Sequence, residues 1–294
     1  MNVMEDLGFS SEPSDIMHID LNSCFARIEQ QANPHLRNRP VAVCAYVTPN
    51  GCILAPSVEA KLTGVRTGMR VKDGKALCPD LMILATDPWK YRNVHLKLKR
   101  LLSEYTPDII PKSIDEFVLD FGKAPLPCKR AYRKSSALNG IAMEIKKRIR
   151  KEIGEWLTVS IGIAPNRFLA KLASGLHKPD GLDEININNF LRVYSNLKLT
   201  DLPYIKLRNA IRLSSVGIYT VGDFYKAPLW KLKAAFASIN GYYWYLRLRG
   251  WEIDNVVFGR KSYGNSYALS KPFSTLGELS PILCKLVIKM CDRL

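Results

Sequence analysis

The chain has 294 residues, of which 47% are hydrophobic and 24% charged, proportions that suit a folded protein and exclude a fibrous or wholly disordered one. Its 43 lysines and arginines exceed its 27 aspartates and glutamates, and the formal net charge of +16 favours a polyanionic partner such as nucleic acid. No apolar run is long enough to span a membrane, and the polar segment 1–15 is unlike a secretory signal.

The cysteines are seven in number and include no Cys-x-x-Cys pair. An odd count without such a pair is typical of a reducing compartment, and it indicates neither a disulfide framework nor a zinc site. We therefore expect a cytoplasmic protein, and a nucleic-acid partner would associate it with the nucleoid if it is bacterial.

The first part of the chain alternates short apolar strands with helices. A buried strand is expected over 16–21, with Asp20 near its end, and Asn22 is expected to cap a helix that stops at Asn33-Pro34. The elements expected next are strands over 40–47 and 52–55 and a helix over 58–62.

The middle of the chain predicts a hairpin between helices. Strands over 108–110 and 117–121 are separated by Pro111-Lys112-Ser113, and the turn of this hairpin would hold Asp115 and Glu116. The surrounding elements are a helix over 91–105, a long basic helix ending at Ile153, a strand over 157–163 and a helix over 166–176. This order predicts an α+β domain with an antiparallel sheet.

After Gly181 the pattern changes. From Leu182 to Trp251 only short helical periods occur, which predicts a separate helical domain. A strand is expected over 260–269, and an apolar stripe predicts a helix over 279–290. One strand and one helix are too little to close a core.

Three carboxylates are the candidate chemical groups: Asp20, Asp115 and Glu116. A hairpin placed beside the Asp20 strand would collect them, and hard divalent cations such as Mg²⁺ prefer an all-oxygen set of ligands. On spacing alone, the alternative stays open that Asp115 and Glu116 are exposed hairpin residues and that Asp20 is a helix cap.

Several motifs, met in order along the chain, resemble those of the Y-family translesion DNA polymerases. The segment Ile19–Glu29 is similar to the first catalytic motif of that family, and Ser113–Asp120 is similar to the second. The fingers of the family are resembled by Glu59–Lys61 with Gly64–Gly68. The palm strand is resembled by Val159–Asn166, the palm helix by Leu169–Lys171, and the segment of the triphosphate-facing lysine by Lys178–Gly181.

The resemblance implies an α+β fold with a catalytic palm of mixed or antiparallel sheet and helices, small α/β fingers, an all-helical thumb and a partial α/β little finger. It implies the following divisions: N-terminal extension 1–13, palm 14–23 and 85–185, fingers 24–84, helix-hairpin-helix-like thumb 186–252, linker 253–259 and incomplete little finger 260–294. We accordingly expect a polymerase that is truncated in the little finger.

The same resemblance implies a template-directed DNA polymerase of the lesion-bypass type, which adds dNTPs to a primer 3′ end and serves DNA repair and damage tolerance. Asp20, Asp115 and Glu116 would be catalytic and, with the Leu21 carbonyl, would hold two Mg²⁺ ions, for which Mn²⁺ is a candidate substitute. The residues implied to contact the nucleotide are Cys24, Phe25, Val58, Lys61 and Lys178, with Phe25 as the steric gate against a 2′-hydroxyl.

Three positions depart from the family pattern. Lys61 stands where many relatives have arginine, Val58 stands where a tyrosine is common, and Pro203-Tyr204-Ile205 replaces a glycine-containing turn in the thumb hairpin. Losing glycine there makes a close approach of the backbone to a duplex phosphate harder.

The implied partners are primer–template DNA and dNTP, with a sliding clamp as a further candidate and no membrane, and the protein is expected to be a monomer. One alternative is a catalytically silent family relative that acts as an adaptor in a translesion complex. The others are a nucleotide cyclase and a plain basic DNA-binding protein. The complete set of three carboxylates argues against the adaptor and the plain binding protein, and the thumb and little-finger segments argue against the cyclase.

Overall fold

The structure, a computed structural model, describes residues 7–122, 135–255, 262, 264–267, 269 and 272–292. The chain divides into two compact units, Met1–Asp254 and Asn255–Leu294, which are described separately.

The larger sheet of the first unit carries the candidate site. Its strands are β1 (Ile16–Leu21), β5 (Ile109–Pro111), β6 (Glu116–Asp120), β7 (Val159–Ala164) and β8 (Leu182–Glu184). Among the described residues it is a five-stranded sheet of order β5-β6-β1-β7-β8. The central strand β1 runs antiparallel to both β6 and β7, whereas β7 and β8 are parallel.

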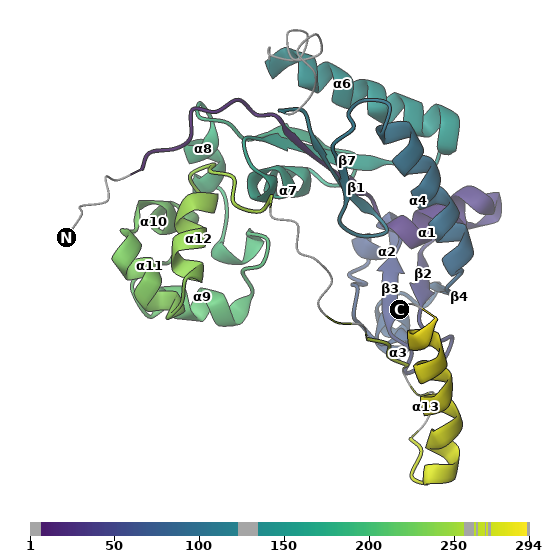
Figure 1. Ribbon diagram of the computed structural model, residues 1–294. Coiled ribbons are helices and arrows are strands. Elements are labelled where there is room, and N and C mark those ends of the chain that lie inside the picture. The colour runs from purple at the N-terminus through teal and green to yellow at the C-terminus, as the bar shows by residue number, and fades with distance from the viewer. Residues whose placement is uncertain are drawn as a thin grey trace. The chain divides into compact units, whose positions relative to one another are not determined.

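Helices cover both faces of this sheet (Figure 1). One face packs on α4 (Pro88–Leu102) and α6 (Ser135–Arg148), which a π-helical turn over Ile149–Ile153 continues; the other face packs on α7 (Arg167–Leu176). Side chains alternate between the faces of a strand, so Met17, Ile19 and Leu21 lie on the α4 and α6 side. His18 and Asp20 therefore share the α7 side.

A second, smaller sheet has the order β3-β2-β4 in the described part of the chain. Its strands are β2 (Val41–Cys44), β3 (Ile53–Pro56) and β4 (Met82–Ala85), and its helices are α1 (Cys24–Ala32), α2 (Val58–Leu62) and α3 (Val71–Leu77). The Ser57 hydroxyl caps α2 by accepting a hydrogen bond from the Ala60 amide. This cap fixes where α2 begins at the edge of the candidate site.

The rest of the first unit is helical. It contains α8 (Phe190–Ser195), α9 (Leu207–Ser214), α10 (Val221–Lys226), α11 (Leu229–Phe236) and α12 (Asn240–Arg247), with 3-10 turns over Pro34–Leu36 and Leu199–Asp201 elsewhere in the unit. Residues near the N-terminus pack here: Phe9 stacks on Phe190 with ring centroids 4.1 Å apart, and the Ser10 amide donates to the Arg249 carbonyl.

The second unit contains the predicted C-terminal helix, which is α13 (Leu276–Cys291). None of its side chains is buried. Part of the strand expected over 260–269 lies outside the described residues, and the described positions 262, 264–267 and 269 form no strand. No helix within the described ranges has the length and apolar character needed to cross a membrane.

The predicted α+β fold is confirmed, with corrections in detail. Asn22 does not cap α1: the N-cap is Ser23, and the side-chain Nδ2 of Asn22 instead donates to Ser160 Oγ at 2.9 Å. Glu116 begins β6 rather than lying in the hairpin turn.

Other elements differ in extent. The segment expected to be wholly helical after Gly181 opens with β8, and the strand expected over 40–47 is limited to β2. The helix expected over 91–105 begins earlier, at Pro88, because the Asp87 side chain caps it by accepting from the Lys90 amide. Neither α3 nor β4 was predicted from the sequence.

Candidate active site

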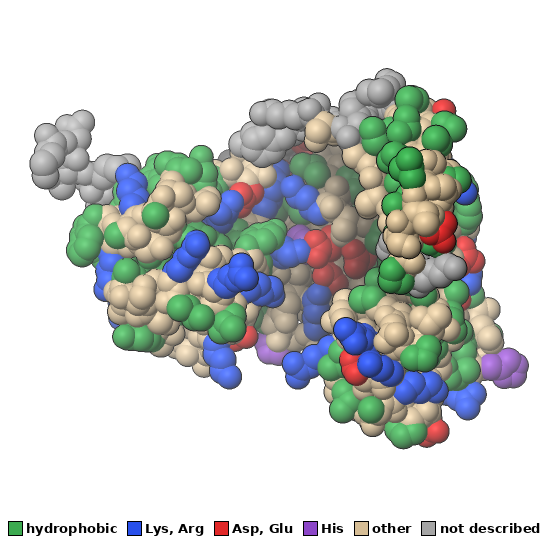
Figure 2. Space-filling model, turned by 90° about the horizontal axis from the view of Figure 1, so that it is seen from below, with side chains coloured by type: hydrophobic (Ala, Val, Ile, Leu, Met, Phe, Trp, Pro, Cys, Tyr) green, Lys and Arg blue, Asp and Glu red, His purple; other side chains and the backbone are tan. Residues whose placement is uncertain are grey.

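A cleft of about 440 Å³ lies at the end of β1. It gathers segments that are far apart in the sequence: the β1–α1 junction, the start of α2, the turn before β6 and the loop after α7. Its lining includes eight of the predicted site residues, namely Asp20, Leu21, Cys24, Phe25, Val58, Lys61, Asp115 and Lys178. Figure 2 shows acidic side chains gathered in a hollow of the surface, with basic side chains spread over the helical part on the left of the view.

Asp20 stands at the centre of this arrangement. Within the sheet it is opposite Glu116 on β6 and Ser160 on β7. Lys178 Nζ lies 2.6 Å from Asp20 Oδ2, and the Asp20 side chain is only 15% exposed. Burial raises the pKa of Asp20, the Lys178 ammonium opposes that shift, and the neighbouring Glu116 and Asp115 carboxylates add to it.

Glu116 does not line the cleft, but it faces the same side of the sheet. Lys171 Nζ on α7 donates to Glu116 Oε1 at 2.5 Å. His18 Nε2 lies 3.7 Å from Glu116 Oε2, longer than a normal hydrogen bond, and forms an ion pair with this carboxylate when the imidazole is protonated. The His18 imidazole and the Lys171 ammonium lower the pKa of Glu116 to about 2, so this carboxylate is ionised at neutral pH.

Asp115 is held by the hairpin turn itself. The Ser113 hydroxyl donates to Asp115 Oδ1 at 2.6 Å. The Leu21 amide donates to the Asp115 carbonyl at 2.9 Å, which ties the turn to the end of β1. The turn therefore places the Asp115 carboxyl beside the strand that carries Asp20.

The three carboxylates share one region, and each is already bonded to a side chain of the chain. Among the described residues, no three His, Cys, Asp or Glu side chains stand close enough together to hold a metal ion as they are. The chemistry of the donors nevertheless fits a hard cation, because Asp20, Asp115 and Glu116 offer only oxygen. The ammonium groups of Lys178 and Lys171 supply positive charge where such a cation would be needed.

The first turn of α1 forms one wall of the cleft. The Phe25 ring stacks on Tyr91 of α4, with ring centroids 4.3 Å apart and an interplanar angle of 15°. Tyr91 is fixed in turn, since its hydroxyl donates to Glu29 Oε1 at 2.9 Å. Cys24 is buried next to Phe25, and burial, together with the charges of Asp115 and Asp20, raises the pKa of its thiol. The protonated thiol is therefore not a nucleophile at neutral pH.

The opposite wall comes from α2. Val58 is the first residue of this helix, and Lys61 follows one turn later. Lys61 Nζ donates to Ser23 Oγ at 2.8 Å across the cleft. Loss of hydration in the cleft and the nearby Lys178 charge lower the pKa of Lys61. Lys61 and Lys178 thus both direct positive charge toward the cleft.

Sequence reasoning missed two partners of Glu116, namely Lys171 and His18. His18 was expected to be structural, and its other ring nitrogen does lie 3.2 Å from Ser174 Oγ. The signal available in the sequence was the spacing of Lys171 and Ser174, which are three residues apart and so share one face of α7. That face is the one turned toward β1.

Comparison of the sequence with known proteins finds a matching family and similar relatives. A model of the impB/mucB/samB family matches residues 19–175. DNA polymerase IV of Bacillus velezensis (strain DSM 23117 / BGSC 10A6 / LMG 26770 / FZB42) is 34% identical over 95% of this chain and 66% of its own length. DNA polymerase IV of Shewanella baltica (strain OS195) is 34% identical over 95% of this chain and 76% of its own length.

Solved structures share the fold. A Y-family DNA polymerase chimera of Dbh and Dpo4 is 24% identical, covers 95% of this chain and 80% of its own, and superposes with a TM-score of 0.83. DinB from Sulfolobus solfataricus is 25% identical over 80% of this chain and 66% of its own, with a TM-score of 0.69. The chain spans about two thirds of the length of the Bacillus relative. The predicted resemblance to the Y-family polymerases is confirmed, and the chain belongs to the impB/mucB/samB family.

Proposed function

We propose that the chain is a template-directed DNA polymerase of the lesion-bypass type, which adds dNTPs to a primer 3′ end and serves DNA repair and damage tolerance. The observation that carries this proposal is the cleft at the end of β1. It brings together two carboxylates, an aromatic ring and two lysines from four separate segments, as nucleotidyl transfer requires. The relatives named DNA polymerase IV support the same activity.

The proposal assigns Asp20, Asp115 and Glu116, with the Leu21 carbonyl, to two Mg²⁺ ions, with Mn²⁺ as a substitute. When bound, these ions neutralise the triphosphate and activate the primer hydroxyl. In their absence Lys178 balances the charge of Asp20. A cation bound to Asp20 would displace the Lys178 ammonium. The ammonium would then contact a phosphate oxygen of the nucleotide.

The remaining cleft residues bind and select the nucleotide in this proposal. Phe25 is backed by Tyr91 and is therefore a rigid surface that would clash with a 2′-hydroxyl. Lys61 and Lys178 act as point charges toward the triphosphate, and Val58 and Cys24 complete the walls. Such chemistry depends on positioning and charge neutralisation, so it needs no protein nucleophile.

We further propose the roles of the parts of the fold. The larger sheet with α4, α6 and α7 serves as palm, the smaller sheet with α1 to α3 as fingers, and α8 to α12 as thumb. The segments 253–259 and 260–294 would be a linker and part of a little finger. Primer–template DNA and dNTP would be the partners of a cytoplasmic monomer, with a sliding clamp as a further candidate.

Primer extension with Mg²⁺ tests the proposal. The wild-type chain should extend a primer on an undamaged template. Asp115→Asn should abolish incorporation and leave duplex binding intact, because the carboxylate serves the chemistry whereas lysines and arginines bind DNA. Asp80→Asn is the matched control, since Asp80 is exposed and lies outside the cleft.

The outcomes separate the candidates. Undiminished extension by the Asp115→Asn variant would contradict the metal assignment. A wild-type chain that binds primer–template but never extends it would favour the adaptor alternative. The presence of all three carboxylates argues against that alternative.

A further inference from the structure

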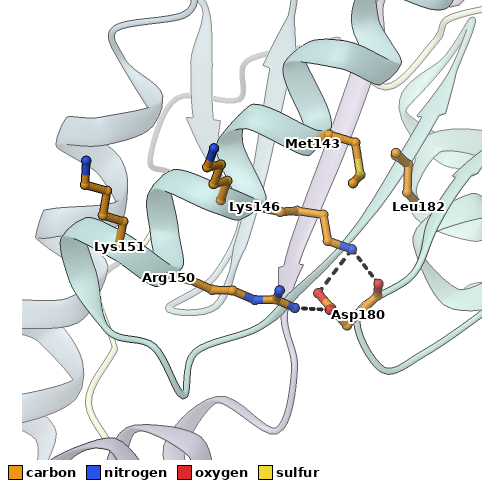
Figure 3. Close-up of a pocket in the computed structure, with 7 residues that line it drawn as sticks. Met143, Lys146, Arg150, Lys151, Asp180 and Leu182 are labelled. Atoms are coloured by element: carbon orange, nitrogen blue, oxygen red, sulfur yellow. Dashed lines mark hydrogen bonds and ion pairs between the residues drawn. The ribbon is translucent and has the colours of Figure 1, made fainter.

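A basic pocket of about 550 Å³ lies behind the loop that carries Lys178. Its cations come from α6 and the π-helical turn: Lys146, Lys147, Arg150 and Lys151. Figure 3 shows Lys146 and Arg150 pointing to Asp180, which belongs to the loop between α7 and β8. The nucleotide-site face of the same loop carries Lys178.

The ammonium of Lys146 binds to this loop. Its side chain is only 10% exposed. It donates to the Asp180 carbonyl, donates to the Gly181 carbonyl at 3.2 Å, and lies 3.1 Å from Asp180 Oδ1. The loop thus gives this ammonium two hydrogen bonds and one ion pair. Two of these acceptors are backbone atoms, so the contact fixes the path of the main chain.

Other contacts hold the loop from two further directions. Arg150 pairs with Asp180 Oδ2 and is itself 47% exposed. On the other side of the loop, the side-chain oxygen Asn22 Oδ1 accepts from the Asp180 amide at 2.9 Å, and Ser160 Oγ of β7 accepts from the Gly181 amide at 3.3 Å.

This support is needed because Asp180 has a φ of +61°, a left-handed conformation that costs a non-glycine residue about 1 kcal/mol or more. A loop in such a conformation persists only where its surroundings determine it. Lys178 is two residues away, and its ammonium reaches Asp20 Oδ2. The path of the loop therefore determines where that ammonium lies.

We propose that Lys146 is a positioning residue for nucleotide binding: together with Arg150, it fixes the loop so that the Lys178 ammonium faces the incoming triphosphate. The inference rests on the proposed function, in which Lys178 contacts the nucleotide. Lys147 and Lys151 have the same charge and line the same pocket, but no contact to the loop is found for them among the described residues.

Single-nucleotide insertion kinetics with Mg²⁺ and primer–template test this inference on the full chain. Lys146→Met should raise the KM for dNTP roughly fivefold or more and change kcat much less, because it displaces a binding group rather than a reacting one. Arg150→Met should raise KM in the same direction by a smaller factor. Lys147→Met, the matched control, should leave KM within about twofold of wild type.

A double-mutant cycle separates positioning from a structural role. If Lys146 acts through Lys178, Lys146→Met should have almost no further effect on KM in a Lys178→Ala background. The same cycle with Arg150→Met gives an independent answer if Lys146→Met fails to fold, because Arg150 is partly exposed and its loss is easier to tolerate.

Two results would overturn the inference: a wild-type KM in both positioning variants, or the same fold increase in KM with and without Lys178. An unchanged KM in Lys178→Ala would remove the role of Lys178 and the inference with it. The polymerase proposal would survive that result, provided that the wild-type chain extends primers and Asp115→Asn does not.

Discussion

The ammonium of Lys178 lies 2.6 Å from Asp20 Oδ2, which joins the lysine expected to meet phosphate to a carboxylate expected to meet metal. In the proposed reaction Asp20 binds a metal ion and Lys178 contacts a phosphate, and neither group can do so while the two are paired with each other. Asp20 is mostly buried and Lys178 is 41% exposed, so the lysine is the member that can move. In the proposed reaction, cation binding to Asp20 and nucleotide binding to Lys178 would therefore be coupled through this ion pair.

The first prediction follows from that competition. Lys178→Met should raise the affinity of the nucleotide-free protein for Mn²⁺ by roughly two- to fivefold, since a partly exposed ion pair no longer has to be broken. Titration calorimetry measures the affinity directly. Lys61→Met is the control, because Lys61 bonds to Ser23 rather than to a carboxylate. A lower Mn²⁺ affinity in the Lys178 variant would show that the lysine assists the cation.

The second prediction concerns sugar selection. Phe25→Ala should lower the preference for dNTP over rNTP at least tenfold, about 1.4 kcal/mol of transition-state free energy, because the ring that would clash with a 2′-hydroxyl is gone. Single-turnover incorporation of each nucleotide gives the ratio. Tyr91→Phe should retain the preference, since it keeps the stacked ring and removes only the hydroxyl that bonds to Glu29. An unchanged ratio in Phe25→Ala would leave Phe25 with a packing role only.

The third prediction is a pH dependence of stability that originates at Glu116. Its pKa in the folded chain is about 2, below the ordinary value of 4.5, so its contribution is complete above pH 4.5 and is lost as the pH falls toward 2. Comparison with Glu116→Gln isolates this group. In metal-free buffer, the wild type should be more stable than the variant by roughly 2–3 kcal/mol near neutral pH.

Urea unfolding at a series of pH values measures this difference. It should shrink between about pH 5 and pH 2 as the wild-type carboxylate becomes protonated. A difference that is constant over this range would mean that His18 and Lys171 do not stabilise the ionised form.

Much of the larger sheet was predictable from local sequence. The strands over 16–21 and 159–164 are apolar, β-branched and followed by polar turns, which is the pattern of buried strands. By contrast, β8 consists of Leu-Asp-Glu and becomes a strand only because it pairs with β7. The interior of α3, Lys72–Lys75, is polar and contains glycine, so it shows no apolar period.

The sequence predicted those site residues that belong to a recognisable local motif. It did not predict contacts between residues that are far apart in the sequence and are brought together only by the fold. The hairpin motif indicated that Asp115 would lie beside Asp20, and the structure places both in one cleft. Lys146 is 34 residues from Asp180, and a basic stripe on a helix is usually a solvated face. Only the packing of α6 against the sheet shows that one of those lysines is buried.

The fourth prediction tests the contact between α7 and the sheet. A Cβ atom at Gly162 of β7 would lie 2.1 Å from the Ala170 carbonyl oxygen and 2.2 Å from the Ser174 amide nitrogen. Both are backbone atoms that cannot rotate away, so Gly162→Ala should cost about 3 kcal/mol or more of unfolding free energy. Chemical denaturation measures the loss.

Gly175→Ala is the matched control on α7. A Cβ there would meet no atom within 4 Å, and alanine favours a helix more than glycine does. That variant should be as stable as wild type or slightly more stable. Equal stabilities of the Gly162 and Gly175 variants would contradict the close packing of α7 on β7.

The fifth prediction concerns the hairpin in which Pro203-Tyr204-Ile205 replaces a glycine turn. Tyr204 has a φ of +68° and its side chain is 62% exposed, so the residue bears left-handed strain without much packing in return. Tyr204→Gly should therefore stabilise the chain by about 1 kcal/mol. It should also strengthen duplex binding, because a backbone without a side chain can approach a phosphate more closely.

Gly217 provides the reciprocal test within the same helical part. Its φ is +72°, and an added Cβ would meet only Lys231 Nζ, at 3.7 Å. Gly217→Ala should lose about 1 kcal/mol from backbone strain alone, so two substitutions at nearly the same φ should change stability in opposite directions. Thermal unfolding gives both signs, and fluorescence anisotropy with a labelled duplex at several salt concentrations gives the affinity. A destabilised Tyr204→Gly variant would mean that the exposed tyrosine contributes more through packing than its backbone conformation costs.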